Sequence, residues 1–171
     1  MRLNEESLEA LIVKQMVDGG WQEGASTDYE PAYALDLPQL VSFIEATQPD
    51  LIDALSLHAE TPARHAFLSR VQGEVTKRGV VEVLRRGIGH NQHHVDFFYP
   101  TPSIGNAKAV ALFAENRFAV TRQVHYSPTD KGLSLDVVAS INGLPVFTFE
   151  LKNNITKQTF DDAVDQYKRD R

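Results

Sequence analysis

The chain has 171 residues, no cysteine and a formal net charge of −6 at pH 7. Its length suits one domain with a real core, and 42% hydrophobic and 23% charged residues are ordinary globular values. The lack of cysteine excludes disulfides, thiolate zinc sites and a cysteine nucleophile. No apolar run approaches the roughly 20 residues that cross a membrane, and the N-terminal residues do not form a signal peptide. We therefore expect a cytoplasmic protein with no membrane partner.

The charge is unevenly distributed along the chain. Residues 1–60 carry 12 acidic and two basic side chains, whereas residues 61–171 carry 15 basic and 11 acidic ones. The net acidity argues at first against nucleic acid as a partner. The last two-thirds of the chain could nevertheless face a polyanion, which the first third could not. Ordinary solvated surface would explain the same asymmetry.

The first half of the sequence predicts helices. Apolar side chains recur at helical spacing over residues 5–18, and Gly19-Gly20 would end that helix. Residues 22–36 are polar and irregular. Pro38 and Pro49 suit the first turns of two further helices. Trp21, Phe43 and Phe67 are expected in the core. The later helices are predicted at about 38–47, 49–58, 62–78 and 80–87.

The second half predicts a sheet. Asn142-Gly143 lies between two apolar segments and is a strong hairpin signal. Helices that flank a sheet containing this hairpin indicate a single α/β (α+β) domain, mainly helical over 1–90 and rich in strands over 91–171. The predicted strands are His94–Tyr99, Phe118–Tyr126, Leu133–Ile141 and Pro145–Lys152, with helices at 107–115 and 156–170.

Three charged residues interrupt the apolar strands of this hairpin. Asp136 lies on the first strand, and Glu150 and Lys152 lie on the second. A two-residue turn would put 136 and 150 on opposite faces of the sheet, because side chains alternate along a strand. An odd loop or a β-bulge would put all three on one face. We predict the odd loop, or a bulge that has the same effect.

Two carboxylates that converge with a lysine could hold Mg²⁺ and cleave a phosphodiester. Mg²⁺ prefers oxygen ligands, polarises the phosphate and lowers the pKa of a bound water. The lysine could orient that water or stabilise developing charge. A cross-strand salt bridge would explain the same residues, and a Glu-x-Lys pattern is common by chance.

Two other motifs were considered. His90, His93 and His94 could bind a metal, but their spacing fits no zinc pattern and favours a polar loop. The chain has no phosphate-binding loop of the Gly-x-x-x-x-Gly-Lys-[Ser/Thr] type, so we expect it not to hydrolyse ATP by itself.

The residues around the three charges resemble a known family. Asp136, Glu150 and Lys152 match the D…E-x-K core of PD-(D/E)xK nucleases. Their surroundings closely resemble the N-terminal nuclease domain of the restriction (R) subunit of type I restriction–modification enzymes, over residues 110–171 above all and also over 1–25. The most distinctive words are Asn142-Gly143-Leu144-Pro145 and Glu150-Leu151-Lys152-Asn153, with Asn116–Val124 and Leu133–Asp136 before them.

The resemblance implies a site and a fold. In the family pattern Asp136 and Glu150 bind Mg²⁺ with the Leu151 carbonyl, and Lys152 is the catalytic lysine. Glu9 occupies the position of the family's N-terminal helix glutamate and could support the metal site; plain helix surface is the alternative. The implied fold is a restriction-endonuclease-like core, a central mixed sheet with flanking helices.

The last predicted helix carries a Gln/Tyr motif in the family, often Gln-x-x-x-Tyr. Here Gln166 directly precedes Tyr167, which departs from that spacing. The resemblance implies that both contact DNA near the site, and Lys168 and Arg169 add positive charge suited to phosphates. Core packing of Tyr167 and a solvated helix face for the two cations are the alternatives.

The resemblance also implies a larger machine. Type I R subunits couple ATP to DNA translocation through motor domains, which would lie beyond Arg171, and act with specificity and methyltransferase subunits in bacteria or archaea. We therefore expect an Mg²⁺-dependent endonuclease domain that cleaves double-stranded DNA. A catalytically silent DNA-binding or docking module, and a stand-alone resolvase-like nuclease, are the rival interpretations.

Overall fold

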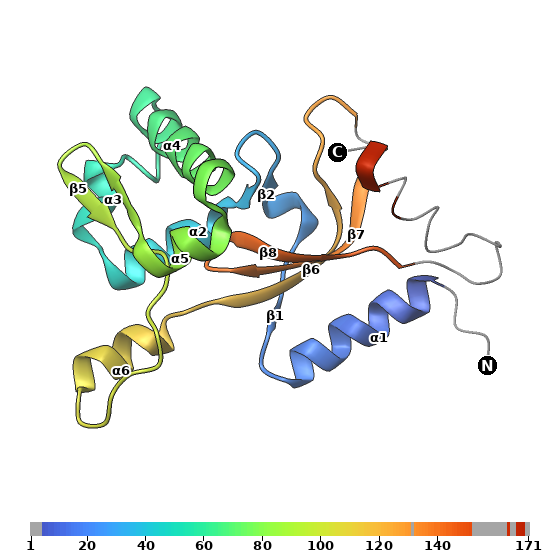
Figure 1. Ribbon diagram of the computed structural model, residues 1–171, viewed down its shortest axis with the longest axis horizontal. Coiled ribbons are helices and arrows are strands. Elements are labelled where there is room, and N and C mark those ends of the chain that lie inside the picture. The colour runs from blue at the N-terminus through green and yellow to red at the C-terminus, as the bar shows by residue number, and fades with distance from the viewer. Residues whose placement is uncertain (1–4, 131, 152–163, 165–166, 170–171) are drawn as a thin grey trace.

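The computed structural model describes residues 5–130, 132–151, 164 and 167–169. Its centre is a four-stranded sheet with the strand order β1-β6-β7-β8. β1 (Gln22–Glu23) runs parallel to β6 (Phe118–His125), whereas β6, β7 (Ser134–Ile141) and β8 (Leu144–Phe149) are antiparallel. The sheet is therefore mixed, and helices flank it (Figure 1), as predicted for an α/β protein.

The first helix covers part of the sheet. α1 (Glu5–Asp18) has the predicted bounds, and Val13 packs against Val120 of β6 and Val137 of β7. Trp21 lies just after the helix; it is half-buried, packs against the same cluster and meets Phe118 edge to face at 5.5 Å between ring centroids. Trp21 thus lies at the margin of this small core.

The main hydrophobic core lies among four helices beside the sheet. These are α2 (Leu37–Thr47), α3 (Asp50–Ala54), α4 (Pro62–Arg78) and α5 (Val80–Arg86). Phe43 and Phe67 are completely buried there, as predicted. Leu144 at the start of β8 belongs to the same cluster, so the core joins the helices to one end of the sheet. No helix among the described residues is long and apolar enough to span a membrane.

The helix predicted at 49–58 is shorter than expected. α3 ends at Ala54, and Ser56 has a positive φ of 53°, which turns the chain out of the helix. Short elements also occupy the segment predicted to be irregular: η1 (Ser26–Asp28), β2 (Tyr29–Glu30) and β3 (Leu35–Asp36). α6 (Ala107–Ala114) agrees with its prediction within one residue.

The loop predicted around the three histidines is a hairpin. β4 (Ile88–His90) pairs with β5 (His93–Val95), and His90 lies opposite His93. Asn91 in the turn has a positive φ of 54°. Asparagine tolerates this conformation better than most residues, which explains why so short a turn forms here.

The strand predicted over His94–Tyr99 is wrong beyond Val95. Side-chain amides take the backbone hydrogen bonds that a strand partner would have taken. Gln48 donates to the Asp96 carbonyl and accepts from its N–H, both at 2.9 Å. Asn116 does the same for Tyr99, at 2.7 and 3.2 Å. The segment is thus extended and satisfied without joining a sheet.

The turn between β7 and β8 is buried. Asn142 and Gly143 both have positive φ, 51° and 83°, as a tight two-residue hairpin requires. The Asn142 side chain is completely buried, accepts from the Arg117 N–H at 2.6 Å and donates to the Phe97 carbonyl at 2.8 Å. The Gly143 carbonyl accepts from the Asp36 N–H at 2.8 Å. This turn therefore joins the sheet to the start of α2.

Candidate active site

The hairpin has the bulge that the sequence analysis required. Ile141 pairs with Leu144 across the two-residue turn, but Val137 pairs with Phe149, because the register shifts between Ala139 and Ser140. The strand predicted to run to Lys152 ends at Phe149, so Glu150 lies just past β8. One further step of the shifted register would put Glu150 opposite Asp136. Directly opposite residues lie on the same face of a sheet. The bulge thus gives β8 the register that would align Glu150 with Asp136 on one face, which a regular hairpin would have prevented.

A hydrogen bond ties the end of β8 to Asp136. The Leu151 N–H donates to Oδ2 of Asp136 at 2.6 Å, and Asp136, Glu150 and Leu151 are all half-buried. A short hydrogen bond of this kind is typical of a charged carboxylate acceptor. It holds the Glu150-Leu151 segment beside the Asp136 carboxylate, which is the arrangement that a shared metal would need.

Glu9 is connected to the same strands through a residue that the sequence analysis missed. Arg122 pairs with Val137 and Val124 with Leu135, so Gln123 of β6 lies opposite Asp136. The Gln123 amide donates to both carboxylate oxygens of Glu9, each at 3.0 Å, and accepts from the Ser134 hydroxyl at 3.2 Å. Glu9 is only 6% exposed. It is therefore not plain helix surface.

Gln123 also has a positive φ of 50°, inside a strand. A non-glycine residue in this region is strained unless its surroundings hold it there. The hydrogen bonds to Glu9 and Ser134 are what hold the Gln123 side chain. The sequence signal was a lone amide in an otherwise β-forming segment, whereas the strain is visible only in the structure.

Other predicted site residues are only partly described. Lys152 and Gln166 lie outside the described residues. Tyr167, Lys168 and Arg169 form a helical segment and are exposed, Tyr167 by 49%. Tyr167 is therefore not fully buried, and both the DNA-contact prediction and the packing alternative for it stay open to test. Lys168 and Arg169 lie at the surface, which both the predicted phosphate contact and the alternative of a solvated helix face require.

The donors near Asp136 suit a hard cation. Within the part of the chain that the structure describes, no three His, Asp or Glu side chains gather closely enough to hold a metal. Asp136, Glu150 and the Leu151 carbonyl nevertheless form an all-oxygen set. Mg²⁺ is commonly held by only one or two carboxylates, its other positions being taken by water and substrate phosphate. The described residues thus fit Mg²⁺ better than a metal that demands a complete protein cage.

A groove of about 550 Å³ opens beside this end of the sheet. Its wall includes His125 at the end of β6, which pairs with Ser134, two residues before Asp136. The opposite wall comes from η1, β2 and the residues that follow. Hydroxyl groups dominate the polar lining, and such groups commonly contact DNA phosphates. The remaining lining residues are Ser26, Thr27, Tyr29, Glu30, Pro31, Ala32, Ser127 and Pro128.

A second buried carboxylate lies away from this site. Asp36 is 6% exposed, caps α2 by accepting from the Gln39 N–H at 3.0 Å, and joins the helix to the hairpin turn. Burial raises the pKa of Asp36 to about 6, although the hydrogen bond from Gln39 acts in the opposite direction; nearby Asp28 raises the pKa further. Asp36 therefore belongs to the joint between helices and sheet.

Comparison with known families supports the resemblance seen in the sequence. The family model described as "Type I restriction enzyme R protein N terminus" matches residues 2–171. The chain belongs to this family. No curated protein and no solved structure matched the chain. Membership of this R-subunit family extends the likeness through residues 35–90, where the sequence motifs gave little guidance.

Proposed function

We propose that this domain is an Mg²⁺-dependent endonuclease with a PD-(D/E)xK core, which cleaves double-stranded DNA. The observation that carries the proposal is the β-bulge, whose register pairs Val137 with Phe149 and would align Asp136 with Glu150, in a chain of the restriction-enzyme R-subunit family. A bulge disrupts a strand ladder and is a designed feature where it re-aims a side chain. Val146 lies at the register shift and packs against the main core, so the bulge serves packing as well as the alignment of the two carboxylates.

Asp136, Glu150 and the Leu151 carbonyl would hold the metal. Mg²⁺, when bound, supplies charge that polarises the phosphodiester and favours ionisation of a water. The Leu151 N–H keeps Asp136 oriented. Lys152 would position the attacking water, whose oxygen bonds to phosphorus while the bond to the leaving sugar oxygen breaks and that oxygen takes a proton. Glu9 would act through Gln123 to fix the strand beside Asp136.

DNA would reach this site along the groove beside β6. The hydroxyl side chains that line the groove could donate hydrogen bonds to phosphate oxygens. Gln166, Tyr167, Lys168 and Arg169 would add contacts near the cleaved bond. Cleavage would be coupled to ATP-driven translocation by domains outside this chain, with specificity and methyltransferase subunits as partners. Recognition of a DNA sequence would then belong to another subunit.

The test is cleavage of a plasmid by the assembled restriction enzyme, with Mg²⁺ and ATP present. We expect Asp136→Asn and Lys152→Ala to lower cleavage more than about 100-fold, since each removes a group that acts on the reacting phosphate. Asp130→Asn is the matched control, because Asp130 is an exposed carboxylate of the β6–β7 turn. ATP hydrolysis, measured in the same samples, should stay unchanged in all variants.

Undiminished cleavage by Lys152→Ala would overturn the assignment of that lysine. Equal losses in Asp136→Asn and Asp130→Asn would overturn the specific role of Asp136. A parent enzyme that binds and translocates DNA but never cuts it would support the silent docking module. Efficient cleavage by the 171 residues without partners or ATP would instead support the stand-alone nuclease.

A further inference from the structure

The positive charge of this chain is concentrated in one segment. Residues 62–94 contain six Lys and Arg, two Glu and four of the six histidines. Their net charge of +4 equals the whole positive balance of residues 61–171. The segment forms α4, α5 and the β4–β5 hairpin, which lie together at the end of the sheet where β8 begins (Figure 1). Asp136 is near the start of β7, at the opposite end.

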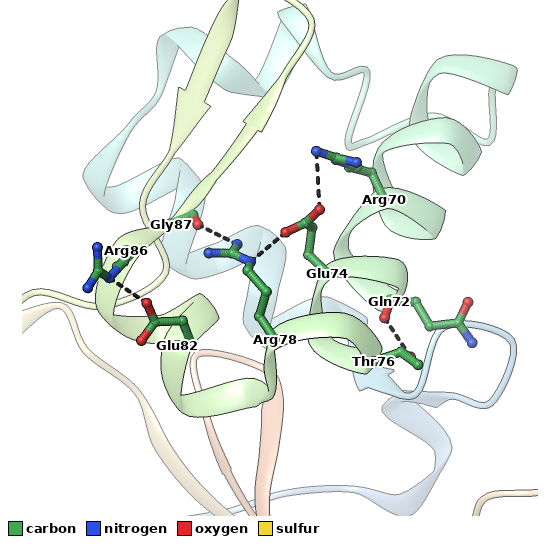
Figure 2. Close-up of polar contacts among 8 residues, drawn as sticks. All are labelled: Arg70, Gln72, Glu74, Thr76, Arg78, Glu82, Arg86 and Gly87. Atoms are coloured by element: carbon green, nitrogen blue, oxygen red, sulfur yellow. Dashed lines mark hydrogen bonds and ion pairs between the residues drawn. The ribbon is translucent and has the colours of Figure 1, made fainter.

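Most of the acidic side chains in this segment form ion pairs within it. Glu74, which is 8% exposed, is shared by Arg70 and Arg78, at 3.2 and 2.5 Å (Figure 2). Arg78 also donates to the Gly87 carbonyl at 3.0 Å, so it joins α4 to the end of α5. The Arg78 side chain is 26% exposed, whereas that of Arg70 is 52% exposed. Arg70 is therefore the arginine of this pair that faces outward.

Arg70 and Lys77 lie on one stripe of α4. They are seven residues apart, which is two helical turns or about 10 Å along the axis. Both are exposed, and Lys77 makes no ion pair with a described residue. Gly73 lies between them, and a Cβ added there would meet nothing within 4 Å. Glycine weakens a helix, and no packing within the described structure requires it here.

The hairpin adds histidines beside Arg70. The His90 ring meets Phe67 edge to face at 5.5 Å between centroids. Burial lowers the pKa of His90, and the positive charges of Arg70 and His93 lower it further. His90 thus lies within the field of the α4 stripe. Its imidazole can form hydrogen bonds and adds no negative charge to this surface.

We propose that the stripe of Arg70, Gly73 and Lys77, with His90 beside it, binds the phosphate backbone of duplex DNA independently of sequence. The two cations would each neutralise a phosphate, and the bare helix at Gly73 lets the backbone approach closely. The inference goes beyond the proposed cleavage site, because it concerns a separate surface at the other end of the sheet. A duplex held at both ends would stay aligned with the site.

The composition of this surface favours DNA over a protein partner. The centre of a protein interface is usually rich in exposed aromatic and large apolar side chains. None of the exposed large hydrophobic residues in the described part of the chain lies on α4. Phosphate contacts, in contrast, need only well-placed cations and amides. Binding of an acidic protein segment is the alternative outcome of the test.

The test measures binding of a fluorescent 20-base-pair duplex by the assembled enzyme without ATP, in EDTA and over a range of salt. We expect Arg70→Gln with Lys77→Gln to weaken binding about tenfold or more at low salt, and to lower the salt slope by about two. Lys14→Gln with Lys108→Gln removes the same charge from α1 and α6, and its binding should stay within twofold of the parent.

Gly73 provides variants that do not disturb the Arg70 ion pair. Gly73→Glu puts a carboxylate between the two cations, and Gly73→Gln is its neutral match; both suit a helix better than glycine. Gly73→Glu should bind the duplex clearly more weakly than Gly73→Gln. Equal binding by these two, or equal losses in both double variants, would overturn the proposal. Unchanged duplex binding with lost subunit assembly would assign the surface to an acidic protein.

The outcome is independent of the cleavage mechanism. In the same duplex assay, adding Arg70→Gln with Lys77→Gln to Asp136→Asn should again weaken binding about tenfold or more relative to Asp136→Asn alone, because the stripe acts independently of the cleavage site. If the parent enzyme does not cleave DNA but Arg70→Gln with Lys77→Gln still weakens duplex binding in a salt-dependent way, only the nuclease proposal is wrong. If cleavage depends on Asp136 but duplex binding ignores the stripe, only this inference is wrong.

Discussion

The helical region and the end of the sheet that carries Asp136 are stabilised in different ways. Among the described residues, sixteen buried hydrophobic side chains form one cluster centred on α2 to α5. The corresponding cluster under α1 contains only Val13, Val120 and Val137. Near Asp136, another small cluster of Val124, Leu135 and Val138 is supplemented by polar contacts: Glu9 with Gln123, Gln123 with Ser134, and Leu151 with Asp136.

This difference separates stability from the proposed chemistry. Burial of apolar surface supplies most of the stabilisation of a domain, so the free energy of folding should depend mainly on the helical region. Under the proposed function, this end of the sheet has to leave the carboxylates of Asp136 and Glu150 accessible to a cation and to DNA, which limits how much apolar surface can be buried around them. The two regions meet at the Asn142-Gly143 turn, where Asp36 holds the hairpin.

The largest expected effect comes from the helical core. Phe67→Ala should lower the free energy of unfolding by about 3–5 kcal/mol, because it removes a fully buried ring and leaves a cavity. Chemical denaturation measures this loss of stability.

Val13→Ala removes far less apolar surface and should lower the free energy of unfolding by about 1–2 kcal/mol. It should nevertheless lower cleavage more than this small loss of stability explains, since α1 carries Glu9. Equal losses of stability in the two variants would contradict the comparison.

Asp36→Asn tests the joint between the two regions. The folded-state pKa of about 6 exceeds the ordinary value of 3.8, so the folded form binds the proton more tightly. The resulting stability is fully present below pH 3.8 and is lost as the pH rises through about 6. Asparagine caps a helix as well as aspartate and carries no charge. We expect the variant to be about 1–3 kcal/mol more stable than the parent at pH 8.

That gain should disappear at low pH. Unfolding curves at pH 4 and pH 8 measure the difference, and Asp53→Asn, an exposed aspartate of α3, is the control that should change little at either value. If Asp36→Asn is less stable than the parent at pH 8, the charged Asp36 carboxylate stabilises the fold, and burial is not what dominates its energetics.

Two glycines should respond in opposite directions, and the effect at Gly73 should be the smallest of all. Gly73→Ala should raise the free energy of unfolding by about 0.5–1 kcal/mol, because the space around its Cβ is open and alanine favours a helix. Gly143→Ala should have the opposite sign, since φ is 83° and the added Cβ would lie 2.4 Å from the Asp36 carbonyl oxygen. Thermal melts of both variants provide the measurement. A destabilising Gly73→Ala would reveal packing at α4 that the described residues do not show.

Local patterns predicted the regular elements well. The bounds of α1 and α4 follow directly from apolar periodicity and from glycine or proline at their ends, and the Asn142-Gly143 hairpin follows from turn chemistry. The segment after Val95 could not be predicted in this way. Its backbone groups bond to Gln48, Asn116 and Asn142, and two of those amides are distant in sequence.

For the candidate site, too, local sequence pattern predicted some features and tertiary packing decided the others. The sequence by itself determined which residues carry charge within apolar strands, Asp136 and Glu150, and that only an odd loop or a bulge could align them, because side chains alternate along a strand. The tertiary structure decided that the alignment comes from a bulge in β8 and that Gln123 links Glu9 to the strand beside Asp136. Register shifts and amide contacts depend on where distant segments pack, and local pattern carries no record of that packing.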